Sequence, residues 1–232
     1  MRLSNTAPVH GTTTNPGWSF DVRLAVWLVA LDVTLVLIYL VLGYMVVIGR
    51  LGEIPHLLNV GRDWSLGEMI GYAKWIFLIA AMIVSYRRAP NFIFLALALL
   101  FIVTLADDTL QLHETHNRWT TRSGLIERSD LALREVGYFA TVGLAVAVPL
   151  LIGWFRADPP LRRKVAPLLL LFGAIAFCGI GVDFIHASLP DRSVGSGLAG
   201  AVEDGGEMIF LSLMFSYAIA TFWRPRPGSP SS

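Results

Sequence analysis

The chain of 232 residues has a single cysteine, Cys178, and only 15% of its residues are charged. One cysteine excludes a framework of internal disulfides. The net charge of +1 leaves no basic surface for nucleic acid, and 55% hydrophobic residues exclude a disordered chain. The polar–apolar alternation of membrane β-barrel strands is also missing, so helices remain as the structure that a bilayer permits.

Long apolar segments are what the sequence has in abundance. A helix needs about 20 mostly apolar residues to cross roughly 30 Å of hydrocarbon. Six segments meet this requirement: Leu24–Ile48, Gly67–Tyr86, Asn91–Leu112, Glu135–Trp154, Val165–His186 and Asp204–Trp223. Because the connections are short, we predict one all-α integral membrane domain over residues 24–223, a bundle of six transmembrane helices. Residues 1–23 and 224–232 are expected to form flexible tails.

Lysine and arginine are distributed unevenly between the two ends of this predicted bundle. The end that carries both termini holds ten of them, in very short loops with little acid, and the other end holds seven. The positive-inside rule therefore predicts that both termini lie in the cytoplasm. We expect a multi-pass protein of the cell membrane, with a bacterial inner membrane as its location and membrane lipid as its partner.

Acidic residues and histidines gather at the opposite end, which this orientation turns outward. Three stretches hold most of them: Asp107-Asp108-x-x-Gln111-x-His113-Glu114-x-His116, Asp183-x-x-His186 and Glu203-Asp204-x-x-Glu207. Ionisable groups in or near hydrocarbon are costly, so they usually face a cavity, a partner or an ion.

Position on the predicted helices separates these acids into two groups. A helix N-terminus favours a negative charge without any ligand. The acids predicted at helix starts are Glu68, Glu135, Glu203 and Asp204. At a helix C-terminus the dipole and the exposed carbonyls repel an anion. The acids that approach predicted C-termini are Asp107, Asp108, Glu114 and Asp183. A metal ion, bound protons or arginines such as Arg118 and Arg134 would compensate this second group.

Helical spacing predicts that several of these groups converge. Asp183 and His186 are three residues apart and Glu203 and Glu207 are four apart, so each pair shares a helix face. One further face is predicted to carry Asp107, Gln111 and Glu114. Carboxylate-x-x-His together with carboxylates from neighbouring helices is the arrangement of metal sites in helical bundles. Carboxylate and imidazole ligands suit zinc, iron or manganese.

The sequence therefore predicts a divalent metal ion, zinc or iron, at the outward end. The expected metal ligands are Asp107, His113, Glu114, Asp183, His186 and Glu207. Asp108 and Glu203 are expected to orient these ligands or to act as a general base. A bound ion would activate water for attack on an ester, amide or phosphoester, and the shallow position suits a lipid-like substrate. The leading hypothesis is a metal-dependent membrane hydrolase; a pair of irons would instead suit oxidation of a hydrophobic substrate.

The predicted plan resembles membrane hydrolases of the alkaline-ceramidase type, in which His and Asp residues on helices surround a zinc near one membrane face. The chain departs from them because it has no paired H-x-x-x-H and six predicted spans instead of seven. It is also similar in plan to membrane di-iron proteins, whose repeated histidine boxes it lacks. Both resemblances concern architecture and leave the function open.

Two other classes of function are compatible with the sequence. A carrier or channel for protons or metal ions would use the carboxylates to gather cations, although the cytoplasmic half lacks a matching polar pathway. A non-catalytic subunit of a membrane complex would use the charged rim to dock its partner.

Two charges lie deeper in the predicted membrane region. Asp32 is about 13 Å along its helix from Arg23, and Lys74 is about 9 Å from the outer end of its own helix. Charges at this depth are usually paired, so we predict an ion pair between Asp32 and Lys74 on adjacent helices. Alternatively, Lys74 is a counter-ion for the outer carboxylates.

Overall fold

The structure is a computed structural model that describes residues 20–112, 115–116, 119, 131–182 and 194–223. The long helices of this part are α1 (Val22–Val47), α2 (Leu66–Arg88), α3 (Phe92–Leu110), α5 (Leu131–Arg156), α6 (Pro159–Ala176) and α8 (Val194–Ala218). Shorter helical segments are η1 (His56–Leu58), η3 (Phe177–Val182) and η4 (Ile219–Trp223). Among the described residues, six helices are long and apolar enough to cross a membrane, so the predicted six-helix membrane bundle is confirmed.

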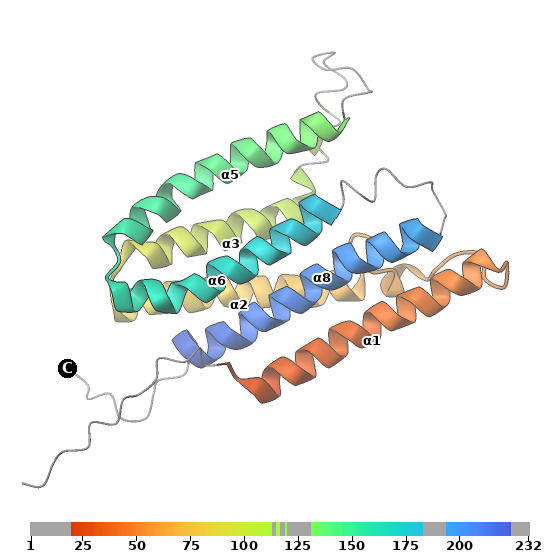
Figure 1. The fold of residues 1–232 in the computed structure, drawn as a ribbon, viewed down its shortest axis with the longest axis horizontal. Helices are drawn as coiled ribbons and strands as arrows, with labels where there is room; N and C mark the ends of the chain where they lie inside the picture. Colours follow the sequence, from red (N-terminus) through yellow and green to blue (C-terminus); the bar gives the residue numbers. More distant parts are fainter. Residues whose placement is uncertain (1–19, 113–114, 117–118, 120–130, 183–193, 224–232) are drawn as a thin grey trace, which may run out of the picture.

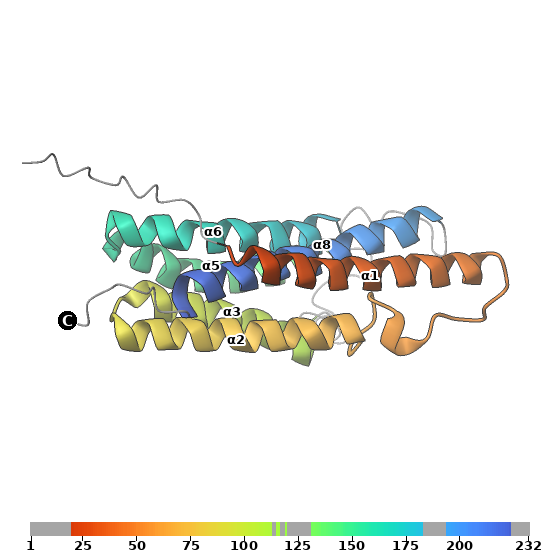
Figure 2. The same cartoon turned by 90° about the horizontal axis from the view of Figure 1, so that it is seen from below.

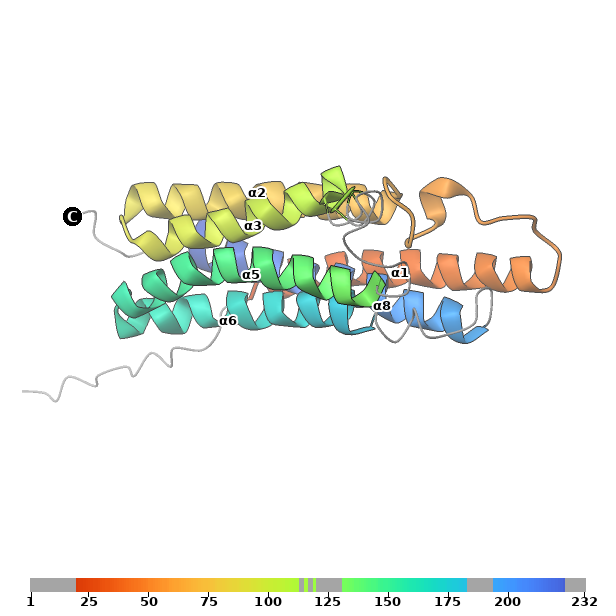
Figure 3. The same cartoon turned by 90° about the horizontal axis from the view of Figure 1, so that it is seen from above.

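The helices run side by side along one axis (Figure 1). α2 packs against α3 and α8, α3 against α5, and α6 against α8. α1 packs on the outside of α8, and Figure 2 shows it crossing the middle of the view in front of α8, with α6 above it and α2 below. α5 packs mainly along α3 (Figure 3). The packing therefore runs from α5 through α3 and α2 to α8, and α8 also contacts α6 and α1.

The starts of several helices follow from their capping residues. The side chains of Asp21, Ser65 and Asn91 accept backbone N–H groups from the first turns of α1, α2 and α3. These contacts satisfy donors that have no partner within the helix. α6 begins at Pro159, where the missing N–H of proline costs nothing.

The last predicted span begins in the wrong place, because α8 starts at Val194 and the sequence predicted Asp204. The extra turns are rich in glycine, alanine and serine, which lower the apolar character that marks a span. Small residues allow close packing of membrane helices. At Gly205, an added Cβ would lie 2.8 Å from Cγ2 of Val36 on α1, so glycine is what allows this helix contact.

A packed apolar core fills the half of the bundle nearer to both ends of the described chain. Its fully buried side chains come from α2, α3, α6 and α8 and include Leu78, Leu97, Phe101, Leu168 and Met214. At the same end the rings of Phe20 and Tyr217 are 5.2 Å apart, so the start of α1 lies beside the end of α8. The other half of the bundle is less well filled.

Candidate functional site

A cavity of about 630 Å³ lies inside the less filled half of the bundle. Its walls come from α2, α3, α5, α6 with η3, and α8, together with the loop before α2. α1 contributes no residue to this lining. The volume falls within the range of about 300–1,000 Å³ that is common for small-molecule sites.

One end of the cavity is acidic and holds all the carboxyl groups of its lining. These are Asp63, Glu68, Asp107, Asp108, Glu203, Asp204 and Glu207. Among the described residues that line the cavity, none is lysine, arginine or histidine. The acidic groups therefore face one another across the cavity without a basic side chain in its described walls.

The remainder of the cavity is apolar and extends along α5. The α5 residues of the lining recur every three or four positions and are Tyr138, Phe139, Val142, Gly143, Val146, Ala147 and Leu150. From Tyr138 to Leu150 this stripe spans about 18 Å of helix. Opposite it lie Trp75 and Phe172, whose ring centroids are 6.3 Å apart. The cavity is thus polar at one end and hydrocarbon-like along the rest of its length.

Glu207 is partly buried and borders the cavity. The charged groups that act on it most strongly are other carboxyls, those of Asp108, Asp204, Glu203 and Glu68. Its carboxylate packs against the backbone of the π-helical segment η3, because a Cβ at Gly179 would collide with Oε1 of Glu207. Single π-helical turns are frequent at functional sites. This segment ends at Val182, directly before Asp183 in the sequence.

Asp107 is oriented by a phenol from the neighbouring helix. The Tyr138 hydroxyl donates to Oδ1 of Asp107 over 2.7 Å and so links α5 to the end of α3. The ring of His116 lies 5.4 Å from that of Tyr138. Tyr138 therefore connects an acid of the cavity with a histidine of the stretch that follows α3.

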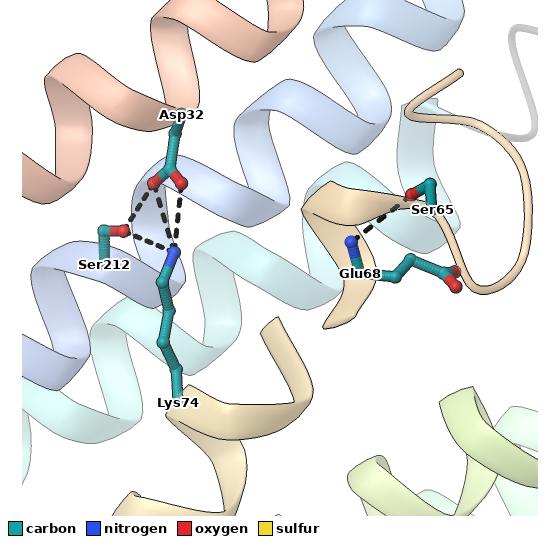
Figure 4. A network of polar contacts seen from close by, with 5 residues as sticks. All are labelled: Asp32, Ser65, Glu68, Lys74 and Ser212. Atoms are coloured by element: carbon teal, nitrogen blue, oxygen red, sulfur yellow. Dashed lines mark hydrogen bonds and ion pairs between the residues drawn. The ribbon is translucent and has the colours of Figure 1, made fainter. Parts of the chain in front are cut away.

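Glu68 has a structural role at the start of α2, as its predicted position at a helix N-terminus indicated (Figure 4). Its backbone N–H donates to Oγ of Ser65 over 3.3 Å. Its carboxylate accepts from the Trp64 N–H over 2.5 Å and from the Tyr72 hydroxyl over 2.8 Å. This arrangement is close to a capping box, and it fixes one wall of the acidic end.

The loop before α2 forms part of the wall of the acidic end, which the sequence did not indicate. The side chain of Gln111 donates to Asp63 of this loop. Gln111 follows the last residue of α3 and has a left-handed backbone, with φ of 50°. A Cβ at Gly61 would lie 3.0 Å from Oδ2 of Asp204, so the loop also lies against α8.

The structure brings four of the predicted site residues to one cavity, namely Asp107, Asp108, Glu203 and Glu207. The other four, His113, Glu114, Asp183 and His186, lie outside the described residues. Within the described part of the chain, no group of three His, Cys, Asp or Glu side chains is placed to hold a metal ion.

Two details of the predicted site are wrong. Asp107 and Gln111 do not share one uninterrupted helix, because α3 ends at Leu110 and the backbone turns at Gln111. Glu203 and Asp204 are not at a helix start, because α8 begins nine residues before Glu203. The favourable N-terminal dipole therefore acts on Glu68 but not on these two acids.

The ion pair expected between Asp32 and Lys74 is present, and it includes a third residue (Figure 4). Lys74 Nζ lies 3.0 Å from Asp32 Oδ1 and 2.7 Å from Ser212 Oγ, and the Ser212 hydroxyl donates to Asp32. Asp32 and Ser212 are 0% exposed and Lys74 is 4% exposed. None of the three lines the cavity, so this cluster ties α1, α2 and α8 together beside it.

Residues 22–221 match the model of a family described as a domain of unknown function, DUF8692, and the chain belongs to this family. No curated protein and no solved structure matches the chain.

Proposed function

We propose that this member of the DUF8692 family is a metal-dependent membrane hydrolase that acts on a lipid-like substrate in the cavity. The observation that carries the proposal is the division of one cavity into an acidic end and an apolar remainder. An apolar chain would fit against the stripe of α5, and the group to be cleaved would then lie among the carboxylates.

The proposed zinc or iron would be held at the acidic end. Asp107, Asp108 and Glu207 would approach it from α3 and α8. Glu207 already contacts the segment that leads into Asp183 and His186, which supports their placement at the same ion. His113 and Glu114 would complete the ligand set.

The side chains of the cavity would carry out the remaining steps. The metal would supply an activated water when bound. Glu203 lines the cavity one helical turn before Glu207 and would take the proton of this water. The Tyr138 hydroxyl holds the Asp107 carboxylate in one orientation, which is the usual task of a partner behind a metal ligand.

The proposed location is the cell membrane, a bacterial inner membrane, with both termini in the cytoplasm. The described chain begins and ends at the end of the bundle that holds Arg87, Arg88, Arg162, Arg163 and Lys164. The positive-inside rule places such an end in the cytoplasm. The acidic cavity would then lie in the outer half of the bilayer, where a lipid of the outer leaflet reaches it.

Transport is less well supported than hydrolysis. A carrier needs polar groups along its whole path, whereas the inner part of this cavity is lined by side chains such as Trp75, Phe172 and Leu150. The buried pair of Asp32 and Lys74 does not extend the polar surface of the cavity, because neither residue lines it.

Elemental analysis of protein purified without chelator tests the proposal, together with hydrolysis of fluorogenic ester and amide lipids. We expect about one equivalent of zinc or iron in the wild type, with loss of metal and turnover in the Asp183→Ala, His186→Ala double variant and in Glu207→Gln. The matched control is Glu53→Gln, since Glu53 is an exposed acid outside the cavity. Absence of metal and turnover from stable wild-type protein would overturn the proposal and favour a non-catalytic subunit.

A further inference from the structure

We propose that the basic end of the bundle binds the phosphate group of an anionic membrane lipid, in a second cavity between α2, α3, α6 and η4. This cavity lies at the opposite end of α2 and α3 from the carboxylates described above, and it does not depend on the reaction proposed there. Its position, its cations and its apolar floor support this ligand.

The second cavity has a volume of about 600 Å³ and lies where two helix-to-helix turns meet. The turn from α2 to α3 and the turn from α5 to α6 lie at the same end of the bundle (Figure 1). Residues 89–91 of the first turn line the cavity, and so do Asp158 and Pro160 of the second turn and the start of α6. Because α2, α3 and α6 are long and apolar enough to cross a membrane, their ends lie at its surface, among lipid head groups.

Two basic side chains line this cavity, Arg88 at the end of α2 and Lys164 in the second turn of α6. Arg88 is held by Nη1, which donates to the carbonyls of Phe222 and Trp223 over 3.3 Å each. Within the described part of the chain its other guanidinium nitrogens make no hydrogen bond, so their N–H groups remain for a ligand. In the same part of the chain the Lys164 ammonium group has no hydrogen bond and no ion pair. Both side chains are exposed, so a ligand at the membrane surface reaches them.

Asp158 is the acid in the described walls of this cavity, and it does not neutralise the two cations. Among the described residues it forms no ion pair with Arg88 or Lys164. It is the N-cap of α6, where the helix dipole favours its negative charge. A guanidinium and an ammonium group that approach from two helices suit an anion with several oxygens, and phosphate is such an anion.

The floor of the cavity is apolar. Phe94 and Phe222 are buried, and their rings contact each other edge to face with centroids 5.9 Å apart. Leu161 adds to this surface. A free phosphate ion loses hydration beside such a surface and gains nothing from it, whereas the glycerol carbons and first methylenes of a lipid pack against it. Basic pockets between membrane helices bind phospholipid head groups in this way.

A bound lipid phosphate would connect helices that the protein joins only through a third. α2 and α6 both pack against α8, and the Tyr217 hydroxyl of α8 donates to the Lys164 carbonyl over 2.8 Å. A phosphate between Arg88 and Lys164 would link α2 directly to α6. Because a ligand that binds only the folded state stabilises it, this lipid should also raise the unfolding temperature.

Native mass spectrometry of the full chain, released from micelles of an uncharged detergent, tests the inference. Dioleoyl phosphatidylglycerol is the anionic probe, and dioleoyl phosphatidylcholine has the same chains without net charge. We expect one phosphatidylglycerol to bind about tenfold or more tightly than phosphatidylcholine. The Arg88→Gln, Lys164→Gln double variant should lose this preference, because each basic residue close to an anionic lipid strengthens binding about fivefold.

The matched control is the Arg87→Gln, Arg163→Gln double variant. It removes the same charge from exposed neighbouring positions that do not line the cavity, and it should keep the preference for phosphatidylglycerol. Asp158→Asn should strengthen binding of the anionic lipid, since it removes the acid of the lining. If the cavity double variant fails to fold, Lys164→Gln alone tests the charge requirement, because its ammonium group makes no contact that the described fold needs.

Two results would overturn the inference directly. Equal binding of the two lipids by the wild type would show that charge is not recognised. An equal loss in the cavity variant and its control would show that charge spread over this end of the bundle accounts for binding. Inorganic phosphate distinguishes the source of the anion: we expect an excess of it to leave the lipid bound, and displacement at micromolar concentration would make the free ion the ligand and overturn the lipid.

Discussion

Lys74 Nζ lies 3.0 Å from Oδ1 of Asp32 and joins α2 to α1 in the interior of the bundle, where both side chains are almost fully buried. Ser212 of α8 contacts both charged groups, so three helices meet at one neutral polar cluster. The cluster satisfies its own hydrogen bonds and adds no net charge, which is how such groups are tolerated in hydrocarbon.

Removal of one partner of this cluster should destabilise the bundle strongly. Lys74→Met leaves Asp32 buried without its counter-charge, and we expect a loss of about 3–5 kcal/mol in the free energy of unfolding. The double variant Asp32→Leu, Lys74→Met should lose less than either single variant, because no isolated charge remains. Thermal and denaturant unfolding in a mild detergent measures both. Equal stability of Lys74→Met and the wild type would show that the pair does not stabilise the fold.

Substitution of Gly179 should affect the site more than the fold. A Cβ at this position collides with the end of the Glu207 side chain, which can move away at little cost, so the Gly179→Ala variant should unfold within about 1 kcal/mol of the wild type. Glu207 would no longer lie against η3, and metal content and turnover should fall together. Gly173→Ala on α6 is the matched control, because no atom lies within 4 Å of its added Cβ. Full metal content and turnover in Gly179→Ala would show that the position of Glu207 against η3 is not needed for the reaction.

Loss of the Tyr138 hydroxyl should lower the affinity of the proposed site for its metal ion. Its hydrogen bond of 2.7 Å to Asp107 joins a neutral donor to a carboxylate, and such bonds contribute about 1.5–3 kcal/mol. For Tyr138→Phe we therefore expect metal affinity to fall roughly tenfold or more. Titration of metal-free protein with zinc measures this affinity. The control is Tyr86→Phe, which removes a hydroxyl at the other end of the bundle; an equal effect of the two variants would indicate a general loss of folding.

At the contact between α1 and α8, a second substitution should restore the stability that a first one removes. Gly205→Ala places a Cβ 2.8 Å from Cγ2 of Val36, a stiff β-branched side chain, and should cost about 1–3 kcal/mol. Val36→Ala removes the clashing methyl groups, so the double variant should recover most of this loss. Unfolding of the two single variants and the double variant gives the coupling energy. If the changes in unfolding free energy of the two single variants simply add up in the double variant, the two residues are not in contact.

The proposed orientation can be tested with introduced cysteines in a Cys178→Ser background. Glu53 is exposed near the acidic end and Ala89 is exposed near the basic end. A membrane-impermeant maleimide added to intact cells should label Glu53→Cys and not Ala89→Cys. The reverse pattern would place the cavity on the cytoplasmic side.

Hydropathy was sufficient to predict the six helices, because each has a long apolar run and lipid permits few other structures. It could not place the start of α8, since the turns from Val194 to Gly200 are built from small residues that resemble a loop in sequence. Hydropathy also could not predict the π-helical segment at Gly179 or the left-handed turn at Gln111, because it does not report local backbone geometry.

Depth and charge sign were sufficient to predict the pair of Asp32 and Lys74, because each needs an opposite charge in hydrocarbon. Ser212 gave no such signal, since a serine is tolerated in a helix without a partner. Asp107, Asp108, Glu203 and Glu207 were predicted as a group from their common depth, and they do line one cavity. The contributions of Asp63, Tyr72 and Tyr138 depend on which helices are neighbours, and sequence periodicity does not determine that.

The cluster of Asp32, Lys74 and Ser212 also constrains the order in which the chain is assembled during synthesis. Asp32 enters the membrane before its counter-charge has been translated, and Ser212 follows 138 residues after Lys74. A lone aspartate at the centre of a helix costs about 2.5–3.5 kcal/mol on insertion, which the very apolar α1 can offset. Because α1 packs along α8 and not along α2, the ion pair is enclosed by protein only after the last helix has entered the membrane. The hydroxyl of the last helix would then complete the cluster when the bundle closes.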